Sequence, residues 1–139
     1  MRLSFALFAD AANLSQEGKL NVLGVFDAVQ VAGLPTVHPR AHLVVRLKGG
    51  PSDVGSHVIT LRWLNPAGTE LWSSNGQLDI GAPPPGVMDM DFPLIAAIDL
   101  PLDAAGTYAM QIALDGTVHG EVKLHVRAEM AQQMSGMVS

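Results

Sequence analysis

A strict alternation of apolar and polar residues is the feature that most restricts the folds open to this chain. Between positions 88 and 100 every second residue is apolar, and Asp89, Asp91 and Asp99 are among the residues between them. A period of two places successive side chains on opposite faces of a strand, so this segment predicts a β-strand with one apolar face. Because Pro93 cannot donate a ladder hydrogen bond, we expect this strand to lie at a sheet edge or to break near its middle.

The same period continues through residues 106–127, where Asp115-Gly116 interrupts it. This dipeptide favours a two-residue hairpin turn, because both of its residues readily adopt positive φ. The sequence therefore predicts a hairpin whose inward positions are Tyr108, Met110, Ile112, Leu114, Val118, Gly120, Val122, Leu124 and Val126.

Shorter alternating segments predict strands at residues 3–9, 42–48, 57–63 and 69–79, and a more continuous apolar run at 20–32 predicts one buried or bent strand. About eight strands with frequent turn signals predict an all-β fold, a two-sheet antiparallel sandwich that is immunoglobulin-like or related. Tyr108 enters its strand directly after a turn, so we expect its hydroxyl group to bond back across a sheet corner, as in immunoglobulin-like sandwiches.

The last twelve residues have a different pattern. Met130, Met134 and Met137 are spaced at i, i+4 and i+7, which is the stripe of a helix. A helix of this length is marginal in water, so both a short helix and an irregular tail remain open. We therefore divide the chain into a β-sandwich domain, 1–127, and a Met-containing tail, 128–139.

The chain is unusually poor in charge: 48% of its residues are hydrophobic and 15% are charged, against about 25% charged in typical soluble proteins. Either small residues inflate the hydrophobic count, or part of the surface is buried against other subunits. The net charge of −5 and the scattered basic residues argue against nucleic-acid binding.

No segment approaches the roughly 20 apolar residues that span a bilayer. Residues 2–11 match a signal peptide only faintly, because the apolar stretch is short, Ser4 interrupts it, and its alternation suits a strand better. The chain has no cysteine, which fits a reducing compartment. We expect a cytoplasmic protein.

Few residues suggest catalysis. The chain has no cysteine nucleophile and no Gly-x-Ser-x-Gly elbow. Asp89 and Asp91 would lie about 7 Å apart on one strand face, a separation that glycosidases can use. They are more simply solvated strand positions, and a hydrolase that uses them is only an alternative. His119 and His125 would be about 20 Å apart, so we expect no metal site and no cofactor.

The opening of the chain is similar to a known group of proteins. Phe8-Ala9-Asp10-Ala11-Ala12 is followed by Glu17-Gly18-Lys19-Leu20-Asn21-Val22-Leu23-Gly24-Val25-Phe26-Asp27, and residues 100–108 read Leu-Pro-Leu-Asp-Ala-Ala-Gly-Thr-Tyr. These segments resemble an uncharacterised family of small bacterial proteins over most of residues 3–127. The resemblance implies an all-β domain of unknown function and assigns no catalytic residue.

We therefore expect a non-catalytic structural or interaction protein, either a homo-oligomer or a small subunit of a larger assembly. The candidate contact residues are Val29, Val31, Trp72, Met130, Met134 and Met137. The alternative is a small-ligand or carbohydrate-binding module that uses Trp72 and the loops around residues 49–56 and 81–87.

Overall fold

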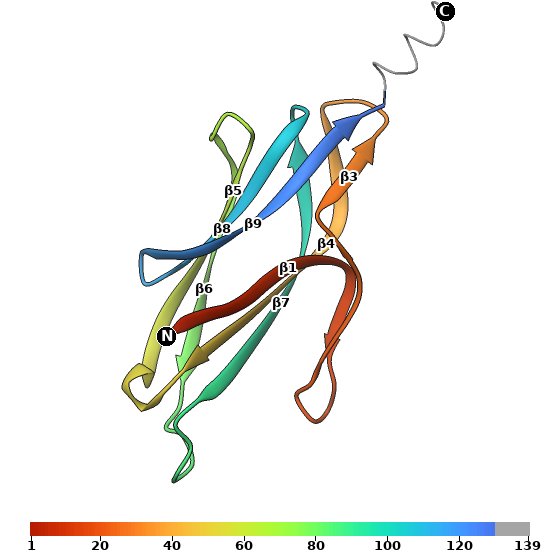
Figure 1. Cartoon of the computed structure of the whole chain (residues 1–139). Helices are drawn as coiled ribbons and strands as arrows, with labels where there is room; N and C mark the ends of the chain where they lie inside the picture. The colour runs from red at the N-terminus through yellow and green to blue at the C-terminus, as the bar shows by residue number, and fades with distance from the viewer. Residues whose placement is uncertain (130–139) are drawn as a thin grey trace, which may run out of the picture.

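The computed structural model describes residues 1–129 and contains nine β-strands in two facing sheets (Figure 1). The first sheet has the order β2-β1-β4-β7, and the second has the order β3-β9-β8-β5-β6. All neighbouring strands are antiparallel except β3 and β9. The predicted β-sandwich is confirmed. The strand bounds are β1 (Arg2–Leu14), β2 (Leu20–Phe26), β3 (Ala28–Val31), β4 (Thr36–Gly49), β5 (Gly55–Leu64), β6 (Glu70–Ile80), β7 (Met90–Leu102), β8 (Gly106–Leu114) and β9 (Thr117–Ala128).

The core lies between the sheets and is built from the inward half of each alternating strand. Its aromatic centre is Trp63, which stacks on Tyr108 with ring centroids 5.2 Å apart and meets the edge of Phe8 at 5.9 Å. Aliphatic residues from both sheets surround this centre: Leu43, Leu47, Leu100, Leu102, Met110, Ile112 and Leu124. Burying side chains of this size supplies the main driving force for folding.

Tyr108 forms the predicted sheet corner. Its hydroxyl oxygen accepts hydrogen bonds from the backbone N–H groups of Asp103 and Ala104, each at 2.9 Å. The hydroxyl proton has two acceptors within reach, Asp103 Oδ1 at 2.9 Å and the Ala104 carbonyl at 2.6 Å. The turn before β8 is thus fixed to the core by one side chain.

Strand β7 is the edge strand that Pro93 predicts. It pairs only with β4 and runs unbroken through Pro93, which lies opposite Arg46. An edge position tolerates proline because one side of the strand has no ladder partner.

The apolar run at 20–32 is two strands, not one. β2 ends at Phe26 in the first sheet and β3 begins at Ala28 in the second, so the chain changes sheets at Asp27. The Asp27 carbonyl accepts a hydrogen bond from the His125 N–H at 2.8 Å, which anchors the crossing to β9. This division raises the count from the predicted eight strands to nine.

The predicted β8–β9 hairpin is confirmed, with positive φ at both Asp115 (+49°) and Gly116 (+83°). Its inward assignment of Val118 is wrong, since this side chain is 54% exposed. Ile112 pairs with Gly120 and Ala113 pairs with Val118, so His119 is an extra residue in β9. A bulge of this kind moves the residues on one side of it to the opposite face.

Within residues 1–129 the only helix is a short 3₁₀ turn, Pro51–Asp53. None of the helices in this part of the chain has the length and apolar character needed to cross a membrane. Met130, Met134, Met137 and the predicted tail helix lie outside the described residues.

Candidate interaction surface

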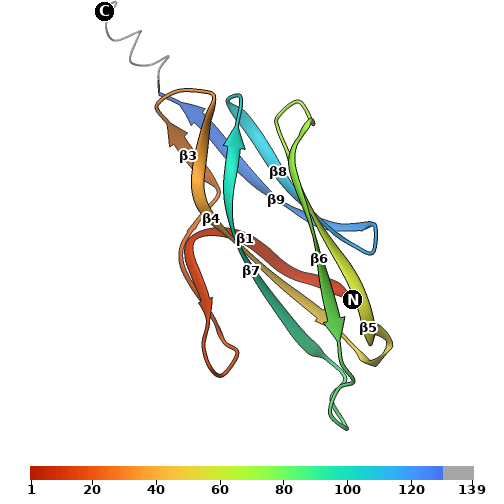
Figure 2. The same ribbon diagram turned by 180° about the vertical axis from the view of Figure 1, so that it is seen from behind.

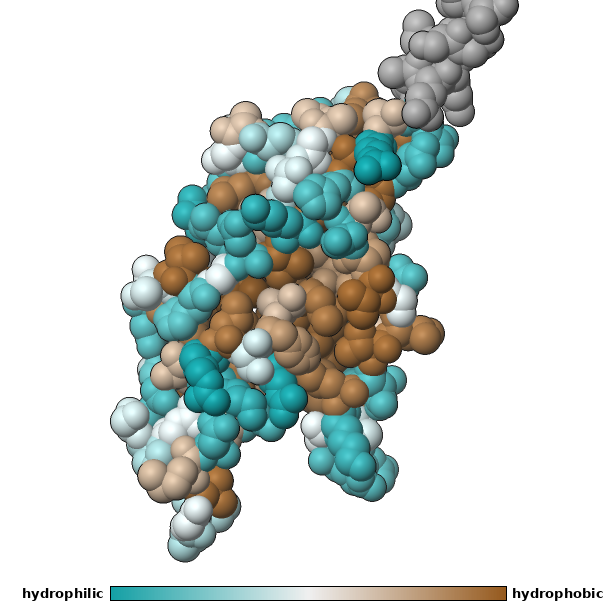
Figure 3. Space-filling model, viewed as in Figure 1, coloured by the Kyte–Doolittle hydropathy of each residue, from teal (hydrophilic) through white to brown (hydrophobic). Residues whose placement is uncertain are grey.

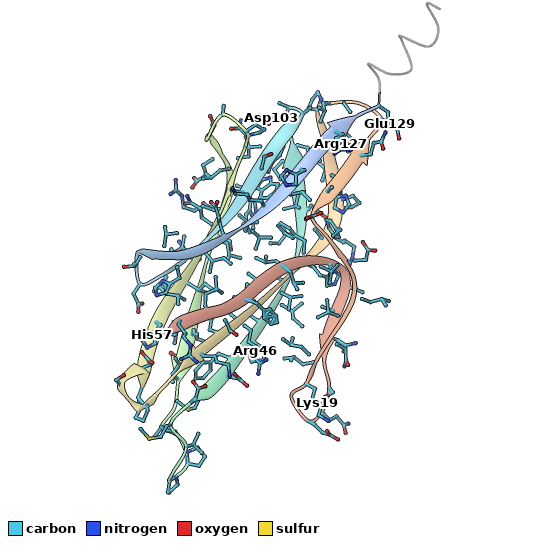
Figure 4. All side chains as sticks on the ribbon, viewed as in Figure 1. Lys19, Arg46, His57, Asp103, Arg127 and Glu129 are labelled. Carbon is cyan, nitrogen blue, oxygen red and sulfur yellow. The ribbon has the colours of Figure 1, made fainter. Side chains whose placement is uncertain are left out.

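A two-stranded ribbon, residues 10–25, projects from the first sheet, and we call it the β1–β2 arm. β1 pairs with β4 only as far as Ala9, and beyond that point it pairs with β2 alone, out to Leu14 and Leu20. Figure 1 shows the arm bending away from the body of the sandwich, and Figure 4 labels Lys19 at its tip. The arm therefore has no third strand beside it.

Gly24 allows the backbone of β2 to adopt a left-handed conformation at one position within the arm. Its φ is +72°, a value that residues with a Cβ rarely adopt. A Cβ at this position would also collide with the carboxylate of Asp10 on the neighbouring strand. Both observations explain why this strand contains a glycine.

The arm carries apolar side chains on both of its faces. The register places Leu23 opposite Ala11 and Val25 opposite Ala9 on one face, while Leu20 pairs with Leu14 on the other. Leu23 is 73% exposed, Val25 is 62% exposed and Leu14 is 45% exposed. Figure 3 shows apolar surface gathered where β1 continues into the arm. A ribbon in contact with water alone would normally have at least one polar face.

A groove separates the arm from the outer face of the first sheet. Leu20 and Val22 line it from the arm, and Phe5 and Pro93 line it from the sheet, with a volume of about 500 Å³. Arg46 and Asp91 also line this groove, so its apolar surface lies beside a charged pair.

Asp89 and Asp91, the two carboxylates considered for catalysis, form ion pairs with basic side chains. Lys48 Nζ lies 2.8 Å from Asp91 Oδ1 and 3.4 Å from Asp89 Oδ2, and Arg46 Nη2 lies 2.6 Å from Asp91 Oδ2. The hydrogen bonds from Arg46 and Lys48 lower the pKa of Asp91 to about 2. A carboxyl group that stays ionised at neutral pH cannot act as a general acid.

Val29 and Val31, two of the predicted contact residues, lie in β3. Both are half-buried and pack against the core. The nearby apolar residues that face solvent are Leu23 and Val25 in β2, which the sequence assigned to the same strand.

Trp72, another of the predicted contact residues, is not exposed. It pairs directly with Trp63, so it faces the inner side of the sheet, where it is half-buried against the core. Leu64 pairs with Glu70, which makes Leu71 an extra residue in β6. This bulge shifts the register by one position and turns Trp72 inward.

The histidines do not converge on a metal site. Within residues 1–129, no group of three His, Cys, Asp or Glu side chains lies close enough to hold a metal ion. His57, at the start of β5, is half-buried.

His57 also belongs to a charged cluster that the sequence did not reveal. Its Nδ1 lies 2.6 Å from Asp115 Oδ2, and its Nε2 lies 2.6 Å from the Asp53 carbonyl. Both partners are acceptors, so both ring nitrogens must carry protons to satisfy them. Two hydrogen bonds raise the pKa of His57: the bond to the Asp115 side chain has the larger effect, and the bond to the Asp53 carbonyl has the smaller one. The hydrogen bond between His57 and Asp115 also lowers the pKa of Asp115.

No curated protein matches the chain. The crystal structure of an immunoglobulin-like protein from Pseudomonas aeruginosa is similar to it at 13% sequence identity and a TM-score of 0.40, over 91% of this chain and 95% of that one. The resemblance to an uncharacterised all-β family is confirmed, because the profile of a family of unknown function, DUF6941, matches residues 4–127. The chain therefore belongs to that family.

Proposed function

We propose that this protein is a non-catalytic interaction protein that binds another subunit, first of all a second copy of itself, through the β1–β2 arm. The observation that carries the proposal is the exposure of Leu23 and Val25 on a ribbon that has apolar side chains on both faces. Clustered apolar surface of this kind marks protein–protein contact sites on soluble domains.

The energetics of the arm favour a partner. Burying a Leu or Val side chain contributes about 1.5–3 kcal/mol, so the arm leaves a substantial gain unused in the isolated chain. A two-stranded ribbon is also only marginally stable in water. A partner that covered Leu23 and Val25 would supply the layer that the arm lacks.

Strand β2 offers a second mode of contact, because it pairs with β1 on one side only. A free strand edge can add a strand from another chain through backbone hydrogen bonds. The ion pairs of Asp89 and Asp91 support a role without catalysis. The inward orientation of Trp72 gives less support to a carbohydrate-binding role, because a stacking platform needs an exposed aromatic ring.

Static light scattering of the full chain between 1 and 100 μM (on the order of the range in which weak dimers form) tests self-association. We expect a mass above the 14.6 kDa of one chain that rises with concentration. Leu23→Lys should return the mass toward that of the monomer, because it places a charge within the interface. Val118→Lys is the matched control, since Val118 is also exposed but lies on β9, outside the arm.

A wild-type chain that stays monomeric throughout this range contradicts self-association. The remaining form of the proposal, a subunit of a larger assembly, then requires a protein that co-purifies with the wild type and with Val118→Lys but is lost with Leu23→Lys. Equal recovery with all three chains would contradict a role for the arm.

A further inference from the structure

A cavity of about 240 Å³ lies between the two sheets, at the side of the sandwich where β6 and β7 are the edge strands. Figure 2 shows the molecule from behind, with β6 and β7 at the centre of the view. The cavity walls are apolar and come from the three strands β4, β5 and β7: Leu43, Val45, Ile59, Leu61, Leu94 and Ala96. Its mouth is formed by exposed residues of β6, namely Ser74, Asn75 and Gln77.

The sequence of β6 explains the empty space. Its inward positions are Trp72, Ser74, Gly76 and Leu78, as their pairing with β5 shows. The two central residues are small, whereas the residues at either end are large. Ala96 adds a third small inward side chain from β7. The wall residues opposite therefore meet no large side chain from the centre of β6, although they pack against the rest of the core, and this gap is unusual in an otherwise dense interior.

The chemistry of the lining defines the kind of ligand. None of the residues that line the cavity is charged, so a ligand with a net charge would lose its hydration without gaining a counter-ion. At the mouth, the Ser74 hydroxyl has no hydrogen-bond partner in the described part of the chain. It is free to bond one polar group of a ligand.

The volume sets the size of the ligand. A cavity of about 150 Å³ lined by Leu, Ile and Phe stays dry and binds benzene. The larger space here suits a ring or a short alkyl chain that carries one additional polar group. We therefore propose that the inter-sheet cavity binds a small neutral molecule, mainly hydrocarbon, with a hydroxyl or carbonyl group that bonds to Ser74.

An added β-strand fits this position less well than a small molecule. Pro93 precedes the cavity residue Leu94 in β7 and has no N–H group to donate at the free edge. Proline on an edge strand opposes the addition of another strand. This site is also separate from the β1–β2 arm, so it does not depend on the proposed interaction function.

Methyl NMR of the full chain titrated with 1-hexanol tests the proposal. We expect saturable shifts confined to the methyl groups of the cavity walls, such as Leu43, Ile59 and Leu94. Hexanoate, which has the same chain length and a negative charge, should bind at least tenfold more weakly. Ser74→Leu should fill the cavity and weaken hexanol binding at least tenfold.

Ser73→Leu is the matched control, because Ser73 pairs with Arg62 and points to the outer face of the same strand. It should bind hexanol as the wild type does. If Ser74→Leu fails to fold, Ala96→Leu fills the same space from β7, with the exposed Ala97→Leu as its control. Equal binding of hexanoate and hexanol, unsaturable shifts spread over the surface, or undiminished binding to the filled variant would each overturn the proposal. Shifts restricted to the backbone of β6 on addition of an extended apolar peptide, without binding of hexanol, would also overturn it.

Discussion

Tyr108 contributes to stability through its hydroxyl group as well as its ring. The hydroxyl oxygen is the acceptor for two backbone N–H groups, those of Asp103 and Ala104. Tyr108→Phe keeps the ring stacked on Trp63 but leaves both N–H groups without this partner. We expect the free energy of unfolding, measured by urea titration, to fall by about 1–3 kcal/mol.

The slope of the urea titration serves as the internal control for Tyr108→Phe. An unchanged slope shows that the variant unfolds from the same compact state. An unchanged midpoint with that same slope would contradict a stabilising role for the sheet corner.

His57 makes stability depend on pH. Its pKa is raised from an ordinary value of 6.5, chiefly by the hydrogen bond to Asp115, so the protonated ring stabilises the fold below pH 6.5 and this contribution is lost as pH rises through the raised pKa. The pKa of Asp115 is lowered from 3.8, chiefly by His57, so its contribution is present above pH 3.8 and is lost as pH falls through the lowered pKa. The ion pair between His57 and Asp115 therefore stabilises the fold most between pH 3.8 and pH 6.5.

We expect the thermal midpoint of His57→Gln to lie furthest below that of the wild type near the middle of this window, and the difference to shrink at pH values above the raised pKa of His57. Asp115→Asn should show the same dependence on the histidine side of the window. Thermal unfolding from pH 4 to 9 measures both differences. A difference that is constant across this range would mean that the imidazolium–carboxylate pair is not the source of the effect.

At the residue scale, the sequence predicted the Tyr108 corner because the tyrosine and its turn are adjacent in the chain. It could not predict the partner of His57, since Asp115 is 58 residues away and meets His57 only through the pairing of β5 with β8. For Trp72, the extra residue at Leu71 sets the register that places it opposite Trp63, and alternation alone does not reveal that extra residue. Contacts across strands, rather than local pattern, decide both cases.

Among the elements, the β1–β2 arm depends most on a single glycine. Gly24→Ala forces a Cβ into a left-handed backbone conformation and into the carboxylate of Asp10. The backbone part alone costs about 1–2 kcal/mol. We expect faster amide hydrogen exchange across residues 10–25, with exchange in β8 and β9 unchanged.

A second variant separates the effect of the backbone strain from the effect of the collision with Asp10. Adding Asp10→Ala to Gly24→Ala removes the collision but not the backbone strain, so protection of the arm should recover only in part. Full protection in the single variant would show that the arm does not need its left-handed residue.

The long alternating elements were predictable from sequence, and the irregular ones were not. β7 and the β8–β9 hairpin follow the two-residue alternation over many residues. Pro93 indicates the edge position of β7, and Asp115-Gly116 indicates the turn of the hairpin. The bulge at His119 adds one residue that the period cannot place. The crossing at Asp27 falls inside an apolar run, so nothing in composition separates β2 from β3. The inter-sheet cavity also depends on which face Ser74 occupies, and that follows from the register with β5.

For the whole molecule, the low charge content of the sequence is matched by large apolar side chains that face solvent. Three large apolar side chains that face solvent within residues 1–129 belong to the arm, namely Leu14, Leu23 and Val25. Other exposed apolar residues are spread over several other strands and loops, such as Val37, Val58 and Met88. The arm therefore holds the largest single group of exposed large apolar side chains in this part of the chain, and this group is the surface on which the proposed subunit contact rests.

The boundary between the sandwich and the tail can be tested by two truncations. Ala128 still pairs with Val31 in β3, and the Glu129 N–H donates to the Val31 carbonyl at 2.8 Å. Deleting residues 128–139 should therefore lower the thermal midpoint below that of a chain that lacks only residues 130–139, because the longer deletion frees the end of β3. Equal midpoints for the two truncated chains would place the boundary at residue 127, as the sequence alone suggested.

The same truncation tests whether the tail and the arm form one contact surface. If Met130, Met134 and Met137 take part in the proposed self-association, deleting residues 130–139 should lower the mass measured by light scattering at a given concentration. Effects of independent surfaces add, whereas residues that share one contact show a coupling energy in a double-mutant cycle. If the tail and the arm take part in the same contact, the loss from the deletion combined with Leu23→Lys should be smaller than the sum of the two separate losses, because that contact can be broken only once. Strict additivity would assign the tail and the arm to separate interfaces, and an unchanged dimer after deletion would leave the arm as the contact by itself.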